Sequence, residues 1–474
     1  MEKEFITYAA NRRLLLLFLG WSMDATPFRD LHKPGYDILA VFGYEHTGND
    51  AFGMLSQQVQ GYDEVITVAW SFGVRIATEF LRIYRHRLPL TGCIAVNGTP
   101  FHIDDKRGIP HAIAEGTLQG LSEQSVRKFR RRMFATADAF SAFCETAPRR
   151  TFDSMHNELE EFVDMDPSPY PEVWQRAVVS GADRIFPPEN QLRAWKEAEV
   201  EIDLLPDAPH FPDLQRVLDR YVINKELVSR RFADACGSYS ENSPVQKDVA
   251  RKLWSLTANH LAIKHLIPRR IIEAGTGDGT LTSLYAKRFP MSQLELWDIA
   301  EVATPSDVPE HTKMRICDAE TEINCLADGS IDLFLSASAL QWFHSPCTFI
   351  ESLGRILAPG GLAAIATYGP GTFKEITQAS GRTLNYPRLG SLISAAENAG
   401  LRVLDSFEET LTLPFGNVIE VMHHIKSTGV NALADNEREA RNSALRLMRA
   451  YPVDTAGTAA LTYVPIYLIV SKPL

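Results

Sequence analysis

Short apolar runs recur along the first half of the chain, and segments with a helical pattern of apolar positions separate them. The run at 14–19 is representative, because six apolar residues follow two arginines and stop at Gly20. Such a short, fully apolar run predicts a strand that is buried on both faces of a parallel sheet. Strands are predicted at 14–19, 37–42, 65–70, 93–97, 176–180 and 200–205. Their alternation with helices indicates an α/β fold with helices on both faces of the sheet.

Two features interrupt this alternation and divide the chain. Residues 110–169 have a helical pattern without a convincing strand, which predicts a helical insertion or cap. After about residue 220 the alternation begins again, with a helix from 243 to about 267. Further strands are predicted at 270–274, 294–298, 331–336, 362–367 and, at the end, 461–471. We therefore expect two domains, at 1–218 and 219–474.

Composition and charge exclude several classes of protein. Lys and Arg number 48 against 59 Asp and Glu, so the net charge is −11. An acidic chain is a poor binder of nucleic acids or anionic membranes, and a 45% share of apolar residues argues against disorder. The run at 14–19 is too short for a membrane span or a secretory signal. The six cysteines form no CxxC motif, so we expect free thiols and a cytoplasmic protein without a metal site.

The segment VAWSFGV suggests an esterase nucleophile. Ser71 directly follows a predicted strand, and Gly73 precedes a helical pattern. Small residues on both sides of a serine at a strand-to-helix turn form the nucleophile elbow of α/β-hydrolases, although Ala69 stands where that motif has its first glycine. The backbone N–H groups of Phe72 and of Trp21, which follows the first strand, would then form the oxyanion hole.

An acid and a base follow in the order expected for this fold. Asp183 comes after the strand at 176–180, and His210 comes after the last strand of this half. The order Ser, Asp, His with each residue at a strand end favours a catalytic triad in which His210 takes the proton of Ser71 and Asp183 orients the imidazole. Asp104 and Asp105 follow another strand and remain alternative acids.

The segments GWSMD, VAWSFG, AVNGTP, DDKRGIP and APHFP together resemble the BioG family. The similarity covers about residues 10–215. BioG proteins are the pimeloyl-ACP methyl ester carboxylesterases of biotin synthesis. The resemblance implies an α/β-hydrolase domain that hydrolyses the methyl ester of pimeloyl-acyl carrier protein and releases methanol.

A glycine-rich turn in the second half indicates a nucleotide cofactor. The strand at 270–274 contains Glu273 and leads into Gly275, Gly277 and Gly279, which let a cofactor approach the backbone. The next strand ends at Asp298, at the spacing suited to binding ribose hydroxyls.

Later motifs narrow the choice among nucleotide cofactors. Asp318 is at the position whose acid faces adenine N6 in S-adenosylmethionine enzymes. The segment SASALQWF begins at Ser336 after the next strand. This order resembles the class I methyltransferases, which implies a Rossmann-like domain that binds S-adenosyl-L-methionine. Trp342 is expected to pack over the cofactor pocket.

A more specific resemblance is to one methyltransferase family, the BioC malonyl-ACP O-methyltransferases. It covers about residues 225–474 and depends on FADACGSYSENSPVQ, SASALQW and TYGPGTFKE. Within the first segment, Tyr239 fits a core aromatic or a substrate contact equally well. A malonyl carboxylate is already ionised at neutral pH, so the transfer needs positioning and desolvation rather than a general base.

The two resemblances together imply a bifunctional enzyme of biotin biosynthesis whose partner is acyl carrier protein. A general esterase fused to an unrelated methyltransferase, and a carrier-binding scaffold with an inactive hydrolase, are the alternatives. The basic residues of the helical insertion would dock the acidic carrier: Arg127, Lys128, Arg130, Arg131 and Arg132. Its apolar residues would line an acyl channel or pack the cap: Phe129, Met133, Phe134, Phe140 and Phe143.

Overall fold

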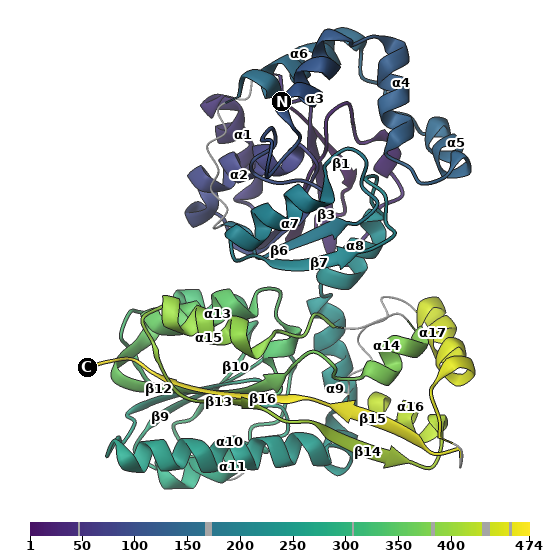
Figure 1. The fold of residues 1–474 in the computed structure, drawn as a ribbon. Helices are drawn as coiled ribbons and strands as arrows, with labels where there is room; N and C mark the ends of the chain where they lie inside the picture. The colour runs from purple at the N-terminus through teal and green to yellow at the C-terminus, as the bar shows by residue number, and fades with distance from the viewer. Residues whose placement is uncertain (46–47, 166–172, 306–307, 381–383, 429–436, 455–456) are drawn as a thin grey trace. The chain divides into compact units, whose positions relative to one another are not determined.

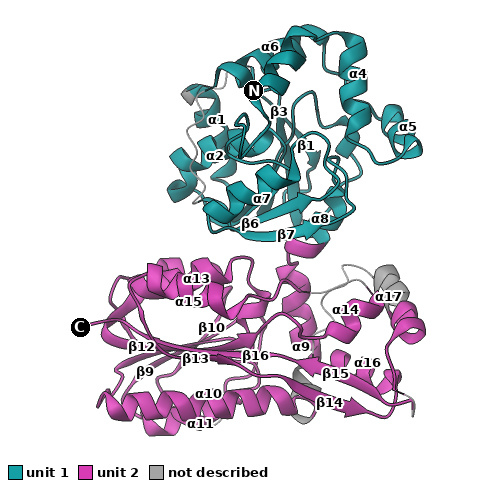
Figure 2. Ribbon diagram, in the orientation of Figure 1, with its two compact units in different colours: residues 1–219 teal, residues 220–474 magenta. Residues whose placement is uncertain are grey.

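The computed structural model describes the chain except residues 46–47, 166–172, 306–307, 381–383, 429–436 and 455–456, and except the side chains of 49, 236–241 and 437–443. The described residues form two compact units, Met1–Asp219 and Arg220–Leu474 (Figure 2). Cys93, Cys144, Cys317, Cys325 and Cys347 are free thiols, and the side chain of Cys236 lies outside the described part.

The first unit is built on a seven-stranded sheet in the order β1-β3-β2-β4-β5-β6-β7. Its strands are β1 (Glu2–Thr7), β2 (Arg13–Phe18), β3 (Tyr36–Phe42), β4 (Glu64–Trp70), β5 (Leu90–Val96), β6 (Arg176–Ser180) and β7 (Glu201–Leu205). All neighbours pair in parallel except β1, which runs antiparallel to β3 at the edge. The leucines of β2 are buried on both faces, which confirms the strand predicted from the apolar run at 14–19.

Helices alternate with these strands and also fill the insertion. The helices between strands and at the end of the unit are α1 (Asn49–Val59), α2 (Gly73–Tyr84), α7 (Pro188–Glu197) and α8 (Leu214–Tyr221). The described part of the segment predicted to be helical forms α3 (His111–Gln119), α4 (Glu123–Arg132), α5 (Ala137–Glu145) and α6 (Phe152–Asp164). Ser122, Thr136 and Thr151 cap the last three of these helices with their side-chain oxygens, so each start is set locally.

The second unit contains another seven-stranded sheet, in the order β10-β9-β8-β11-β12-β16-β13. Its strands are β8 (Arg270–Ala274), β9 (Gln293–Asp298), β10 (Lys313–Ile316), β11 (Ile331–Ala337), β12 (Leu357–Tyr368), β13 (Arg402–Glu408) and β16 (Pro465–Ser471). The first five pair in parallel, whereas β16 runs antiparallel to both β12 and β13. The strands β14 (Leu411–Phe415) and β15 (Ala459–Tyr463) form a separate two-stranded sheet.

Helices cover both faces of this sheet (Figure 1). The helices of the second unit are α9 (Lys225–Asn242), α10 (Pro244–Ile263), α11 (Thr282–Tyr285), α12 (Ala319–Glu322), α13 (Pro346–Ile356), α14 (Lys374–Ser380), α15 (Leu389–Asn398), α16 (Val418–Ser427) and α17 (Glu437–Ala450). On one face Leu253 of α10 and Tyr285 of α11 join the buried core, and on the other face Ile350 of α13 and Leu392 of α15 do so. The sheet thus has one apolar core on each side, as its apolar central strands require.

The prediction of a single final strand at 461–471 is wrong. The segment divides at Val464, where β15 leaves the small sheet and β16 enters the large one. The apolar pattern is continuous across Val464 because both strands are buried, so the pattern carried no sign of the change of sheet. The short or amphipathic edge strands β1, β10, β13 and β14 were also not predicted, since their side chains are largely half-buried or exposed.

Candidate active sites

Ser71 lies between β4 and α2 in a strained turn that the local sequence permits. Its φ is +59°, which is rare for a residue other than glycine. A side chain at Gly73 would lie 2.5 Å from the carbonyl oxygen of Phe18, so only glycine fits two residues after the serine. The turn therefore brings α2 tightly against the end of β2 and presents the serine at the carboxyl edge of the sheet.

A chain of hydrogen bonds joins Ser71 to the histidine and the aspartate predicted with it. Ser71 Oγ lies 3.0 Å from His210 Nε2, and His210 Nδ1 lies 2.8 Å from Asp183 Oδ2. The carboxylate at Nδ1 favours the tautomer whose hydrogen is on that nitrogen, which leaves Nε2 to accept the serine proton. The structure thus brings together residues from three strand ends.

The imidazole and the carboxylate are held by buried groups. His210 is 1% exposed, and its ring lies between Trp70, at 5.4 Å between ring centroids, and Phe186, at 6.4 Å. Asp183 accepts hydrogen bonds from the backbone N–H groups of Ile185 and Phe186, at 2.8 and 2.9 Å. These contacts orient the carboxylate toward His210.

The two alternative acids have other partners. Asp104 accepts hydrogen bonds from the Arg107 side chain at 2.9 Å and from the backbone of Lys106 and Arg107. Asp105 bonds to His111. The carboxylate bonded to His210 is that of Asp183.

The backbone N–H groups of Trp21 and Phe72 border the serine. A methyl group on Gly20 would lie 2.9 Å from Ser71 Cβ, so the segment that carries Trp21 passes directly beside the serine. Within the described part of the chain, neither N–H has a protein acceptor. The Trp21 indole is fixed separately, because its Nε1 donates to the carbonyl of Met155 at 2.8 Å. Both backbone donors are therefore available to a developing oxyanion.

A buried ion pair from the helical insertion supports this loop and was not predicted. Glu158 of α6 accepts from the backbone N–H of Ser22 at 3.4 Å and of Tyr44 at 3.0 Å, and it lies 3.2 Å from Arg150. Burial raises the pKa of Glu158, against the lowering effect of Arg150 and the two backbone donors. A glutamate in an amphipathic helix is ordinarily exposed, so the only sequence signal was its place among Met155, Leu159 and Phe162 on the apolar face.

The basic residues of α4 differ in their surroundings. Arg130 donates to the carbonyl of Ser22 at 2.8 Å, Arg131 to Phe134 at 3.0 Å and Arg132 to Arg184 at 2.7 Å. Arg127 and Lys128 are exposed. The first three thus contribute to the local structure, whereas the last two are accessible to solvent, and Arg127 also borders a cavity among the insertion helices.

The glycine-rich turn of the second unit follows β8, as predicted. Gly275, Gly277 and Gly279 all have positive φ, at +76°, +55° and +77°. A side chain at Gly275 would lie 2.5 Å from Ala339 Cβ, so the turn requires glycine there. The N–H of Gly277 donates to Asp298 Oδ2 at 2.8 Å, which joins the ends of β8 and β9.

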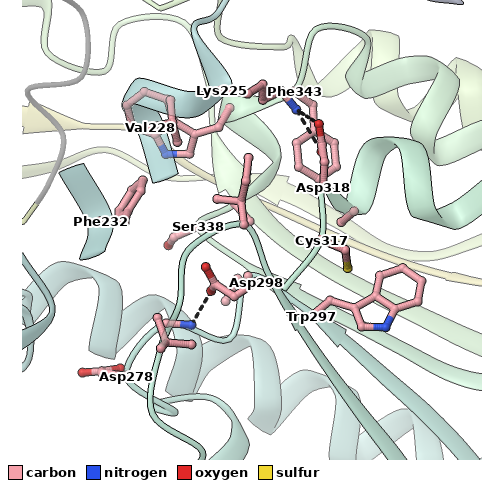
Figure 3. Close-up of a pocket in the computed structure, with 18 residues that line it drawn as sticks. Lys225, Val228, Phe232, Asp278, Trp297, Asp298, Cys317, Asp318, Ser338 and Phe343 are labelled. Carbon is pink, nitrogen blue, oxygen red and sulfur yellow. Dashed lines mark hydrogen bonds and ion pairs between the residues drawn. The ribbon is translucent and has the colours of Figure 1, made fainter. Parts of the chain in front are cut away.

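A pocket of about 840 Å³, counted with the space at its mouth, opens over this turn (Figure 3). Of the predicted cofactor residues, Gly275, Gly277, Asp298 and Asp318 line it. Burial raises the pKa of Asp298, although three backbone N–H groups lower it. The carboxylate nevertheless borders the pocket, where it can accept hydrogen bonds from a ligand.

The other predicted cofactor residues do not line the pocket. The Glu273 carboxylate accepts from the hydroxyls of Thr282 at 2.8 Å and Tyr285 at 2.7 Å, beneath the turn. Ser336 donates to the carbonyl of Ala274 at 2.9 Å, and Ser338, two residues later, borders the pocket. Gly279 lies against Pro305.

Sequence reasoning missed the contribution of α9 to the pocket. Lys225, Val228 and Phe232 of this helix line it. Lys225 Nζ lies 3.0 Å from both Asp318 and Glu320, and Figure 3 shows it reaching Asp318 beside Phe343. The acid expected to face an adenine therefore binds a lysine here. Asn224, which caps α9, was the only local signal that a helix begins beside this lysine.

Comparisons with known proteins identify both units. Residues 1–211 match the family described as Pimeloyl-ACP methyl esterase BioG, and residues 229–406 match a methyltransferase domain family. Over 473 residues the chain is 36% identical to a protein of Bacteroides fragilis called malonyl-[acyl-carrier protein] O-methyltransferase, covering 98% of this chain and 93% of that protein. The chain belongs to the BioG–BioC fusion family.

Other relatives match one part of this fusion. A protein of Chlorobium phaeovibrioides, also called malonyl-[acyl-carrier protein] O-methyltransferase, is 31% identical over 261 residues, which are 53% of the fusion and 98% of that protein. A crystal structure of BioG from Haemophilus influenzae is 30% identical and covers 44% of the fusion and 94% of its own chain, with a TM-score of 0.39. In the described part of the fusion, every helix is too short or too polar to cross a bilayer.

Proposed function

We propose that the chain is a bifunctional enzyme of biotin biosynthesis. Residues 219–474 methylate the free carboxyl group of malonyl-acyl carrier protein with S-adenosyl-L-methionine. Residues 1–218, an α/β-hydrolase domain with a helical cap at about 110–169, hydrolyse pimeloyl-acyl carrier protein methyl ester to the free acid and methanol. Similarity along nearly the whole length to a malonyl-[acyl-carrier protein] O-methyltransferase, together with the BioG match of the first unit, supports this assignment.

The observation that carries the esterase half is the hydrogen-bonded series Ser71, His210 and Asp183. Its members follow parallel strands in the chain order of α/β-hydrolases, and the serine occupies a strained turn before a helix. An inactive scaffold would have no need of this buried, aligned geometry, so the arrangement favours a working hydrolase.

Ester hydrolysis follows from these positions in two steps. Ser71 Oγ attacks the ester carbonyl carbon while His210 Nε2 takes its proton, and the N–H groups of Trp21 and Phe72 receive the negative charge on the oxygen. The bond to the methoxy oxygen then breaks, and His210 returns the proton so that methanol leaves. A water molecule, deprotonated by the same histidine, then attacks the acyl carbon. The bond to Ser71 Oγ breaks, His210 returns the proton to that oxygen, and the free acid leaves as its carboxylate.

The pocket of the second unit has the chemistry that S-adenosyl-L-methionine requires. The buried Asp298 carboxylate borders it and can accept the ribose hydroxyls. Ile299, Val302 and Phe343 provide apolar walls for a flat base. The bound cofactor supplies an electrophilic methyl group, and the residues around it position the acceptor carboxylate in line and exclude water.

The two activities have one chemical purpose. A free carboxylate enters an apolar enzyme tunnel only at a high desolvation cost, and esterification removes that cost during chain extension. Adding the methyl group before extension and removing it afterwards therefore requires these two reactions, on the same carrier protein.

The test uses the purified full-length chain. With S-adenosyl-L-methionine, malonyl-carrier protein should gain the mass of one CH₂, and pimeloyl-carrier protein methyl ester should lose the same mass without the cofactor. Hydrolysis of small esters with no action on either carrier substrate would support the general esterase instead. Absence of both carrier reactions would overturn the proposal.

A further inference from the structure

A second cavity adjoins the pocket over the glycine-rich turn. It measures about 360 Å³, counted with its mouth, and shares Phe232, Ser338 and Trp342 with the larger pocket. Among the described residues, those that line the second cavity include glutamine, tyrosine, threonine and tryptophan, and none of them carries a charged side chain. A methyl acceptor must reach the cofactor from an adjoining space, and this cavity meets that requirement.

Two buried polar atoms in its lining lack partners. Trp342 is 5% exposed and Gln246 of α10 is 8% exposed. Among the described residues, neither Trp342 Nε1 nor Gln246 Oε1 has a hydrogen-bond partner. Such atoms are uncommon in folded proteins because each loses its bonds to water without replacement. Because both residues line the same cavity, a polar ligand bound there is suited to provide the missing partners.

Several of the neighbouring polar groups are already engaged. Ser338 Oγ lies 3.1 Å from the hydroxyl of Tyr368, and Gln341 Nε2 donates to the Ser338 carbonyl at 2.6 Å. Thr367 in turn donates to Gln341 Oε1 at 3.1 Å. These bonds hold the loop after β11, which carries Trp342, and leave the indole N–H as a donor without an acceptor.

We propose that this cavity binds the carboxylate end of the acyl group and that Trp342 Nε1–H donates a hydrogen bond to that carboxylate. The inference rests on the proposed methyltransferase function. Gln246 adds a second neutral contact when its side-chain amide is turned so that the N–H₂ group, rather than the oxygen, faces the carboxylate and donates to it.

A site of neutral donors suits this reaction. One carboxylate oxygen attacks the methyl carbon, so a C–O bond forms, the C–S bond breaks, and its electron pair goes to the sulfur. The negative charge of the acceptor disappears as the bond forms. A lysine or arginine would bind the starting carboxylate more strongly than the transition state and would then raise the barrier. An indole N–H holds both the carboxylate and the ester oxygen.

The decisive variant is Trp342→Phe, which keeps an aromatic ring and removes the N–H. We expect the KM for malonyl-carrier protein to rise by about tenfold or more, as for the loss of one hydrogen bond to a charged group. The Kd of S-adenosylhomocysteine, measured by calorimetry, should stay within about twofold of wild type. Trp254→Phe is the matched control, because the half-buried Trp254 packs against Tyr285 and Phe289 of the core of the same unit.

A comparison of two ligands separates hydrogen bonding from packing. With S-adenosylhomocysteine bound, wild type should bind malonyl-carrier protein more tightly than its terminal amide, and Trp342→Phe should reduce that preference. An unchanged preference, or an equal loss of affinity for cofactor and acceptor, would overturn the inference. If Trp342→Phe does not fold, Gln246→Glu provides the second test, since a like charge should weaken malonyl binding more than amide binding.

The inference and the proposed function fail in different ways. Wild-type protein that transfers no methyl group to malonyl-carrier protein contradicts the proposed function. Wild-type activity combined with a Trp342→Phe variant of normal KM and normal ligand preference contradicts only the role of Trp342.

Discussion

Asp183 and His210 are 27 residues apart in the chain, yet Asp183 Oδ2 lies 2.8 Å from His210 Nδ1 and both side chains are buried. This contact orients the imidazole so that its other nitrogen faces Ser71. We expect Asp183→Asn to lower ester hydrolysis by more than about a thousandfold, because an amide can hold the wrong tautomer. His210→Ala should cost as much as Ser71→Ala, since these residues act as a unit.

The controls for this prediction are Asp104→Asn and Asp105→Asn, whose carboxylates bond to Arg107 and His111. Both should leave kcat for the ester within a few-fold of wild type. A mild Asp183→Asn combined with a severe Asp104→Asn or Asp105→Asn would show that the acid is misassigned.

The two activities should be separable by single substitutions. Ser71→Ala should abolish ester hydrolysis and leave methyl transfer nearly intact, and Asp298→Ala should do the reverse, because the residues belong to different sheets. Steady-state rates of both reactions, measured on each folded variant, check this. Loss of both activities in either folded variant would contradict the assignment of one reaction to each unit.

Carrier recognition by the esterase domain should depend on the exposed pair Arg127 and Lys128. Their joint reversal to glutamate should raise the KM for carrier-bound ester several-fold, since an acidic partner is attracted by local positive charge. The KM for a small methyl ester should not change. Arg130→Glu is the contrasting variant, because Arg130 donates to the Ser22 carbonyl in the loop beside Ser71. This substitution should therefore impair the hydrolysis of both esters. Equal effects of the double reversal on both esters would exclude a docking role.

The esterase domain should prefer long acyl chains. At ~0.8 kcal/mol per buried methylene, the four methylenes that distinguish pimeloyl from malonyl are worth roughly a hundredfold in kcat/KM. Phe140, Phe143 and Met155 line a cavity among the insertion helices, and Met155 also contacts Trp21 through its carbonyl. Charged residues line the same cavity: Glu123, Arg127, Arg130 and Arg150. We expect kcat/KM to rise gradually from three-carbon to seven-carbon methyl esters.

Phe140→Trp tests whether this cavity holds the chain, because the larger ring should reduce the preference for the long ester. Phe129→Trp, outside the cavity lining but in contact with Trp21, is the comparison variant. Equal rates on all esters would contradict an acyl channel. Selectivity between the malonyl and pimeloyl methyl esters would then have to come from the timing of the two reactions.

The stability of the second unit should fall between mildly acidic and neutral pH because of Glu273. Burial raises the pKa of Glu273 from 4.5 to about 7, despite hydrogen bonds from Tyr285 and Thr282. The folded state therefore holds a proton that the unfolded chain has released, and this contribution, of order 3 kcal/mol, is lost as pH rises through that range.

Glu273→Gln keeps the acceptor oxygen but does not titrate. Its melting temperature should exceed that of wild type by several degrees more at about pH 8 than at about pH 5. Thermal unfolding monitored by intrinsic fluorescence checks this. A difference that does not change with pH would mean that Glu273 keeps an ordinary pKa.

Much of the architecture was predictable because its signals are local. The leucine run before Gly20 and the apolar runs of the parallel sheets specify strands by burial alone. The glycines at 275, 277 and 279 occupy positive φ values that other residues rarely adopt, so they mark the turn. Ser71 could be located because it directly follows such a strand, and Asp298 because it is the last residue of one.

The sequence by itself thus determined the two α/β patterns, the helical insertion, the serine turn and the glycine-rich turn, since each depends on neighbours along the chain. Only the tertiary structure decided which carboxylate bonds to His210, that Lys225 binds Asp318, and that Ser338 rather than Ser336 borders the pocket. It also decided that Glu158 supports the loop beside Ser71 and that the last apolar segment divides between two sheets. These outcomes depend on which distant segments pack together. That choice depends on the surface buried in the whole fold, which no local pattern encodes.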